Sequence, residues 1–120
     1  MIEVTYYREH NRLTVIGHAR SDEYGKDLIC ASASILALTL GANVGRMADS
    51  GCVTEPIVKL EEGHAEISCK AKARYRESVR QTFMSVCVGF EILASKWPNY
   101  ISYSVRGWYT GFPLAMMATG

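Results

Sequence analysis

Hydrophobic and polar residues alternate at the start of the chain in the pattern of two β-strands. Residues 2–8 alternate with a period of two, and residues 13–18 are rich in β-branched side chains, so both segments are predicted strands. The polar residues 9–12 between them form a short connection, which is typical of a hairpin. The chain is therefore expected to begin with two paired antiparallel strands.

Two longer segments repeat apolar residues every three or four positions, which predicts amphipathic helices over residues 28–48 and 75–96. Pro98 follows the second segment, where it stops a helix. Gly41 and Gly45 stand inside the first helix, at a cost of about 1 kcal/mol each relative to alanine. A closely packed neighbour would offset that cost, and a helix that is weak near its end is the simpler alternative. The predicted core stripe of the first helix comprises Ile29, Ala33, Leu36, Leu40, Val44 and Met47.

A second hairpin is predicted between the helices, with strands over residues 52–60 and 64–72. Gly63 closes its turn at a position that tolerates a positive φ. Pro56 cannot donate a backbone hydrogen bond, so the first of these strands is expected to be irregular or to lie at a sheet edge. Residues 100–106 alternate as one further strand.

These elements follow one another as ββαββαβ, without the regular strand–helix alternation of a parallel α/β fold. The predicted fold class is α+β, with a mainly antiparallel five-stranded sheet covered by two long helices. Residues 1–107 are expected to form one domain, and residues 108–120 an apolar C-terminal tail whose role the pattern does not indicate. Because two helices leave sheet edges and one face uncovered, a homodimer is expected.

Composition and charge narrow the class of protein. The 120 residues carry a formal net charge of +1, and the arginines at 74, 76 and 80 are interrupted by Glu77, so nucleic-acid binding is only a minor alternative to a solvated helix face. The N-terminal pattern is that of a strand and not of a signal peptide, and no apolar run is expected to reach the length of a membrane span. The four cysteines form no C-x-x-C pair and the three histidines are not spaced as ligands, so no metal or other cofactor is expected. These features favour a cytoplasmic protein with reduced thiols and no membrane or nucleic-acid partner.

One cysteine and one histidine are placed as a reactive pair. His18 ends the second predicted strand, and Cys30 follows a short polar loop, in the first turn of the helix. With Asp27 as the N-cap, Cys30 is the third helical residue, where the positive end of the helix dipole favours the thiolate. A nearby imidazole favours the thiolate further and can serve as general base, while backbone N–H groups at this helix end can hold an oxyanion. A small buried cysteine and an unrelated surface histidine are the simpler alternative.

The residues around this pair each have two interpretations. Asp27 is favoured as a helix cap over a carboxylate that orients His18. Ser34 lies one helical turn below Cys30, where its hydroxyl can bond the thiol or the helix backbone. The loop 19–26, with Gly25 near its end, is either a mobile flap over the site or a plain surface connection. The other histidines and cysteines fit the site less well: His10 and His64 are interpreted as surface residues, Cys69 and Cys87 as core residues, and Cys52 lacks a nearby helix start.

A motif within residues 17–34 resembles the signature of the ribosomal-processing cysteine protease family, Prp. It consists of G-H-A, a polar loop, and the string G-x-D-L-I-C-A-x-x-S. The resemblance covers most of residues 1–107 and implies that His18 and Cys30 form the catalytic dyad. The further positions that match the motif are Asp27 and Ser34, which it implies as supporting residues, and Gly17 and Gly25, which are interpreted as loop hinges.

The same resemblance implies a substrate and an assembly. Prp proteases are dimers that remove a short N-terminal extension from a large-subunit ribosomal protein, without a cofactor. Related proteins encoded near phage structural genes imply a second kind of protein substrate, a capsid or scaffold protein. The tail 108–120 departs from the family pattern, whose chains end near the last strand.

Two readings without a protease remain open from the residues. In the first, the protein is a non-catalytic binding module of ribosome assembly or phage morphogenesis, and Cys30 is structural. In the second, Cys30 is a redox or acyl-transfer thiol, which is disfavoured because no resolving cysteine lies near it in the sequence.

Overall fold

The protein is described from a computed structural model, in which residues 1–18 and 26–107 are placed, Lys26 and Asp27 by their backbone only. The predicted loop 19–26 therefore lies outside the described residues apart from its last position, and so does Gly25. The predicted tail 108–120 also lies outside them.

The elements follow the predicted order ββαββαβ, with two short 3-10 segments added. The bounds are β1 (Ile2–Tyr7), η1 (Arg8–His10), β2 (Arg12–Ile16), α1 (Lys26–Asp49), β3 (Val53–Glu61), β4 (His64–Ala71), η2 (Ala73–Tyr75), α2 (Arg76–Lys96) and β5 (Ile101–Arg106).

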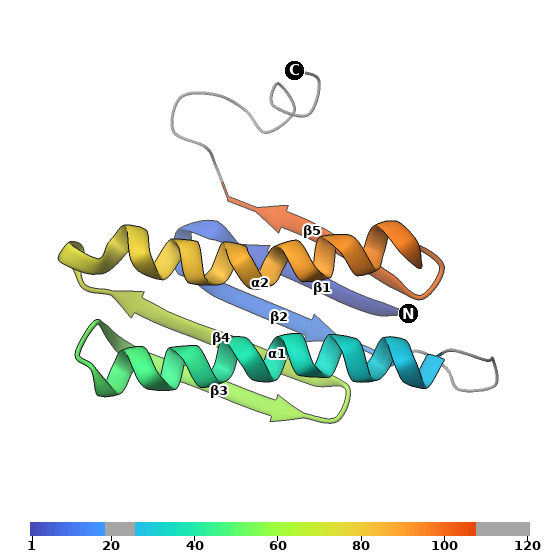
Figure 1. The fold of residues 1–120 in the computed structure, drawn as a ribbon, viewed down its shortest axis with the longest axis horizontal. Helices are drawn as coiled ribbons and strands as arrows, with labels where there is room; N and C mark the ends of the chain where they lie inside the picture. Colours follow the sequence, from blue (N-terminus) through green and yellow to red (C-terminus); the bar gives the residue numbers. More distant parts are fainter. Residues whose placement is uncertain (19–25, 108–120) are drawn as a thin grey trace, which may run out of the picture.

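The five strands form one sheet in the order β3-β4-β2-β1-β5 (Figure 1). Three of the four pairings are antiparallel, as expected, but β5 pairs parallel to β1, with Ile2 opposite Ile101. The fold is thus α+β, and its sheet is mixed and not purely antiparallel. The physical reason is that α2 crosses over the sheet and returns the chain to the end where β1 starts, so β5 runs in the direction of β1.

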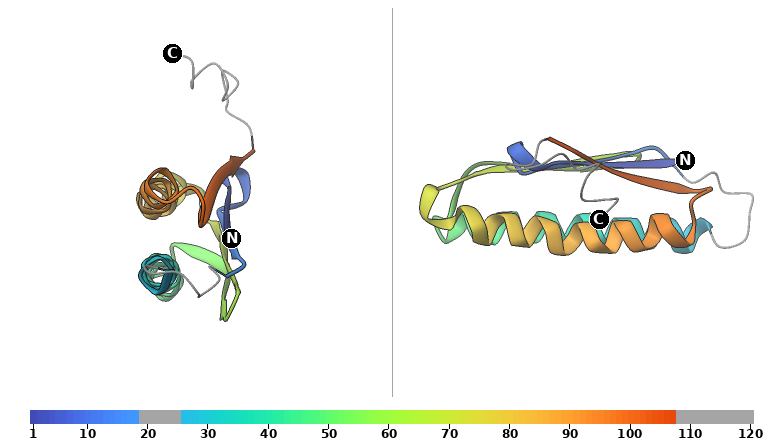
Figure 2. Two further views of the ribbon diagram at one scale, coloured as in Figure 1. Left: turned by 90° about the vertical axis from the view of Figure 1, so that its right-hand side faces the viewer. Right: turned by 90° about the horizontal axis from the view of Figure 1, so that it is seen from above.

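Both helices cover the same face of the sheet, and within residues 1–18 and 26–107 no helix covers the other, open face (Figure 2). The core lies between the helices and the sheet, with Leu13, Ile67, Phe83 and Phe90 fully buried. The open face is largely polar: Arg12 on β2, for example, forms an ion pair with Glu66 on β4 at 3.2 Å. This face is compatible with solvent because alternate residues of antiparallel strands point to opposite sides.

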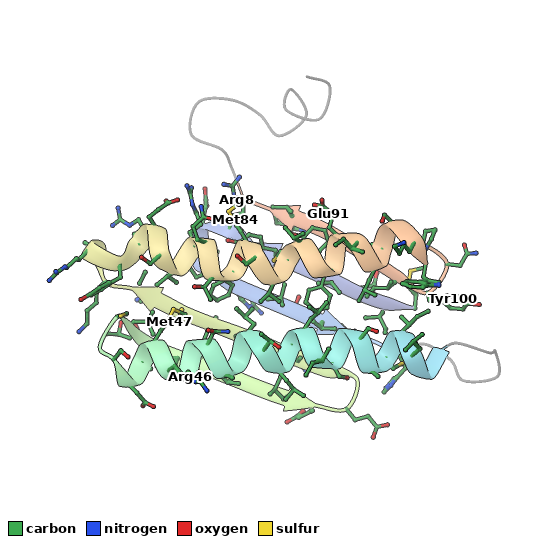
Figure 3. All side chains as sticks on the ribbon, viewed as in Figure 1. Arg8, Arg46, Met47, Met84, Glu91 and Tyr100 are labelled. Carbon is green, nitrogen blue, oxygen red and sulfur yellow. The ribbon has the colours of Figure 1, made fainter. Side chains whose placement is uncertain are left out.

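The predicted core stripe of α1 is confirmed, with Leu40 and Val44 completely buried. Gly41 has the closely packed neighbour that was expected to offset the cost of a glycine in a helix, because a Cβ added there would lie 2.8 Å from Cγ1 of Val58 on β3. Gly45 has no such neighbour within 4 Å, so close packing explains only one of the two glycines. Figure 3 shows the change of side near the helix end: Met47 points toward the space between the helices and packs on the core, and Arg46 points away.

The outward side of α1 is more apolar than expected. Leu28, Ile35 and Leu38 are 64%, 59% and 49% exposed. The segment Leu28–Asp49 contains an 18-residue window with a mean hydropathy of 1.8, so the expectation that no apolar run reaches the length of a membrane span was wrong. The core helix of a soluble protein meets the same criteria of length and composition, and a third of the apolar window is buried in this fold.

The second hairpin has the irregularities predicted for it. β3 is an edge strand, its register with β4 shifts between Thr54 and Ile57, and Glu55 has a φ of +51°. Pro56 lies within this bulge, where its missing N–H does not interrupt a ladder. Gly63 closes the turn with a φ of +77°. On β4, Ala65, Ile67 and Cys69 are buried, and the polar residues between them are more exposed.

The two glycines of α1 give a matched test of packing. Gly45→Ala is expected to raise the free energy of unfolding by roughly 0.5–1 kcal/mol, because alanine is the better helix former and the added methyl meets nothing. Gly41→Ala has the same helical gain but must displace Val58, so it should be less stable than Gly45→Ala by roughly 1 kcal/mol or more. Urea unfolding of both variants measures the difference, and equal stabilities would contradict the close contact.

Candidate active site

The backbone at His18 is fixed from two sides. β2 ends at Ile16, two residues earlier than predicted, and the next residue, Gly17, has a φ of +107°. The Gly17 N–H donates to the Gly63 carbonyl at 2.9 Å, and the N-terminal amine donates to the His18 carbonyl at 3.0 Å. A side chain at Gly17 would strike the Met1 carbonyl, so this position needs glycine for space as well as for φ. The predicted hinge at Gly17 is in this structure a tightly held backbone position.

Cys30 lies in α1 but deeper in the helix than predicted. The helix begins at Lys26, so Asp27 is its second residue and not its N-cap, and Cys30 is its fifth. In a helix that begins at Lys26, the N–H groups without an intrahelical partner are those of residues 26–29. Because Cys30 lies further from the N-terminus of the helix than predicted, the helix dipole stabilises its thiolate less. The amides that can hold an oxyanion lie just before Cys30 in the helix.

The structure brings His18 and Cys30 to the same pocket, which has a volume of about 390 Å³. Cys30 is half-buried and packs against the core, and His18 is exposed. Ser34, one turn further along α1, also lines the pocket, as its predicted supporting role requires. The apolar wall is formed by Ile2, Val15, Ala33, Ala37, Leu38, Leu60 and Ala65, and the β3–β4 turn contributes Glu61, Glu62, Gly63 and His64.

His64 was expected at the surface, and its position turns out to be at the pocket. It is half-buried, opens β4 opposite Ile16 and lines the pocket together with His18 and Cys30. The sequence shows that His64 follows a turn, but not that this turn lies beside the end of β2; that depends on the pairing of β2 with β4. His10, by contrast, is exposed in η1, as predicted.

The four cysteines fall into two groups. Cys30 and Cys52 are half-buried, whereas Cys69 and Cys87 lie in the core, as predicted. Burial raises the pKa of Cys69 to about 11. Burial also raises the pKa of Cys87 to about 11, although a hydrogen bond with Tyr103 opposes the rise. These two thiols are protonated near neutral pH and unsuited to nucleophilic work.

The remaining site residues are only partly placed. Only the backbone of Asp27 is described. The interpretation in which its carboxylate orients His18 therefore stays a prediction. Near the start of α1, the Ser32 hydroxyl donates a hydrogen bond to the Leu28 carbonyl at 2.7 Å. This is the kind of hydrogen bond to the helix backbone that was considered above for Ser34.

A cysteine and two histidines around one pocket, on a small α+β fold, are the side chains that thiol hydrolases use. Comparison with known families agrees with that class: the sequence model described as cysteine protease Prp matches residues 1–102. The chain therefore belongs to the Prp family of cysteine proteases.

Solved structures share the fold. A crystal structure of SMU.848 from Streptococcus mutans is 24% identical, with a TM-score of 0.64 over 88% of this chain and 93% of that one. The essential ribosomal processing protease Prp from S. aureus, in complex with a covalently linked product peptide, is 20% identical, with a TM-score of 0.64 over 88% of this chain and 100% of that one. The S. aureus protease with a substrate peptide is 18% identical, with a TM-score of 0.61 over 88% and 97%. No curated protein matches the chain.

Thiol labelling tests the two groups of cysteines. Near neutral pH, iodoacetamide should alkylate Cys30 and Cys52 in the folded protein and leave Cys69 and Cys87 unmodified. A thiol whose pKa is about 11 has a thiolate fraction roughly a hundredfold smaller than a thiol whose pKa is at the ordinary value of 9.0, and burial also blocks access. Labelling of the buried pair should rise only as the pH approaches 11. Peptide mass spectrometry over a pH series measures each site, and rapid neutral labelling of Cys69 or Cys87 would contradict the assignment.

Proposed function

We propose that the protein is an endopeptidase that cuts a short N-terminal extension from a large-subunit ribosomal protein, with Cys30 as nucleophile and His18 as general base. The observation that supports the proposal is that both motif residues line one pocket, although a loop separates them in sequence. The S. aureus structures, named as a ribosomal processing protease with product and substrate peptides, support the substrate class.

The chemistry follows from the two side chains. His18 takes the thiol proton, and the Cys30 sulfur attacks the scissile carbonyl carbon, so that a tetrahedral oxyanion forms. As the C–N bond breaks, the imidazolium gives its proton to the leaving amine, and a thioester remains on Cys30. Water, deprotonated by His18, then attacks the thioester; the new chain end leaves as a carboxylic acid and the thiol is restored. The amides of residues 26–29 supply oxyanion donors, and Asp27 and Ser34 support the pair.

The walls of the pocket suit a peptide with apolar side chains. Leu38 on α1 and Leu60 on β3 face the pocket from opposite elements, and Ile2 and Val15 contribute from the sheet. An extended peptide buries alternate side chains in such an apolar wall while its backbone reaches the thiol. A phage capsid or scaffold protein with a cleavable N-terminal segment is the alternative substrate, and the cytoplasm is the proposed location for either.

A homodimer is part of the proposal. The open sheet face is largely polar, so it does not require a partner. Several of the exposed apolar side chains lie on the helices, including Ile35 and Leu38 on α1 and Val88 on α2. A second copy packed on the helical layer would remove these side chains from water.

Substitution of the two motif residues tests the reaction. Cys30→Ala and His18→Ala should each lower cleavage of the extended ribosomal protein from the same host by roughly 10³-fold or more, because either change removes an obligatory partner in proton and acyl transfer. Gel electrophoresis and mass spectrometry of the product locate the cut.

His64→Ala is the matched control, because His64 lines the same pocket but is not assigned the base. It should retain most of the activity. Loss of activity in His64→Ala together with retention in His18→Ala would reverse the roles of the two histidines. Cleavage by Cys30→Ala would overturn the thiol mechanism, and binding of the ribosomal protein without any cleavage by the wild type would favour the non-catalytic module.

A further inference from the structure

The ring of His18 rests on the turn between β3 and β4. Its Nε2, Cε1 and Cδ2 atoms occupy the space in which a side chain at Gly63 would stand: a Cβ added there would lie 2.8 Å from Cε1 and 3.3 Å from Cδ2, and closer still to Nε2. Real Cβ atoms essentially never approach a neighbour so closely, so any side chain at this position must displace the imidazole.

The same glycine also holds the backbone of the histidine. The Gly63 carbonyl accepts the hydrogen bond from the Gly17 N–H, at 2.9 Å, so one residue of the turn contacts both the chain before His18 and its ring. The turn belongs to the hairpin that also supplies His64 to the pocket. The ring of the exposed imidazole therefore lies beside the backbone of Gly63, in the space that a side chain there would occupy.

We propose that Gly63 is a positioning residue for His18. Because Gly63 lacks a side chain, the imidazole can lie against the β3–β4 turn, in the position from which it exchanges a proton with Cys30. This inference rests on the proposed function, since it assumes that His18 is the base. It adds a residue outside the motif of residues 17–34, supplied by the β3–β4 hairpin further along the chain.

Gly51 provides a control with the same backbone strain. Its φ is +78°, against +77° for Gly63, so alanine costs about the same conformational energy at both positions. A Cβ at Gly51 would meet only the flexible end of Lys72, at 3.8 Å. Gly51 follows the far end of α1, a helix of 24 residues whose first turns carry Cys30. Gly63→Ala and Gly51→Ala therefore differ in the contact with His18 and not in the demand on φ.

The test is the pH dependence of iodoacetamide alkylation at Cys30, measured site by site in the full-length protein. An imidazolium close to the thiol promotes the thiolate, so a displaced ring moves the rise in rate to higher pH. Gly63→Ala should slow alkylation near neutral pH by about tenfold, as His18→Ala does, and Gly51→Ala should change it less than twofold. Among the residues that the structure describes, the other titratable groups that line the pocket are Glu61, Glu62 and His64, and they are unchanged in all these variants.

A double substitution separates positioning from general destabilisation. Gly63→Ala combined with His18→Ala should react no more slowly than His18→Ala alone, because Gly63 acts only through the imidazole. Equal rates for Gly63→Ala and Gly51→Ala, or a full additional loss in the double variant, would overturn the role of Gly63 and leave the Cys30–His18 pair standing. If His18→Ala leaves the pH dependence of Cys30 alkylation unchanged, the Cys30–His18 pair is overturned, and with it both the proposed function and the positioning role of Gly63.

The position of the ring is read independently by NMR of the imidazole nitrogen and carbon signals. The His18 signals should shift in Gly63→Ala and stay in place in Gly51→Ala, whatever the reactivity of Cys30. Unchanged His18 signals in Gly63→Ala would overturn the contact itself.

Discussion

The antiparallel pairing of β2 with β4 is the constraint on which the site depends. Its register sets Ile16 opposite His64, which brings the β3–β4 turn beside the end of β2. One further backbone bond, from Gly17 to Gly63, continues this pairing past the strand. His18 follows directly, so its position is inherited from the sheet. A histidine at the end of an unpaired segment would have no comparable restraint, and a general base needs a restrained geometry to act.

The thiol is positioned by the packing of α1 on the same sheet. The buried stripe of α1 sets the rotation of the helix, and the small Gly41 lets it approach Val58 of β3 closely. With rotation and distance set by the core, Cys30 faces the pocket at the end of the helix nearest to His18. The core thiols lie in a different environment. Burial raises the pKa of Cys69 and Cys87 to about 11, whereas Cys30 lies at the wall of the pocket.

Membership of the Prp family rests on the sequence, and the structures show how far the fold is kept when the sequence changes. Neighbours that are 18–24% identical superpose over 88% of the chain. Such tolerance is expected where apolar periodicity and turn positions specify the elements, since many side chains of suitable size satisfy the same pattern. The family match is likewise not confined to the short motif, since it extends over residues 1–102.

The sequence by itself determined the order of elements, the buried stripe of α1, the irregular β3 and the positive φ of Gly63, because each follows from local periodicity or turn chemistry. It also indicated His18, Cys30 and Ser34, which the structure brings to one pocket. The parallel pairing of β5 and the arrival of His64 and Gly63 at the site were decided only by the tertiary structure. Strand pairing joins residues far apart in the chain, and no local pattern records which strands meet or which turn comes to lie beside a given side chain.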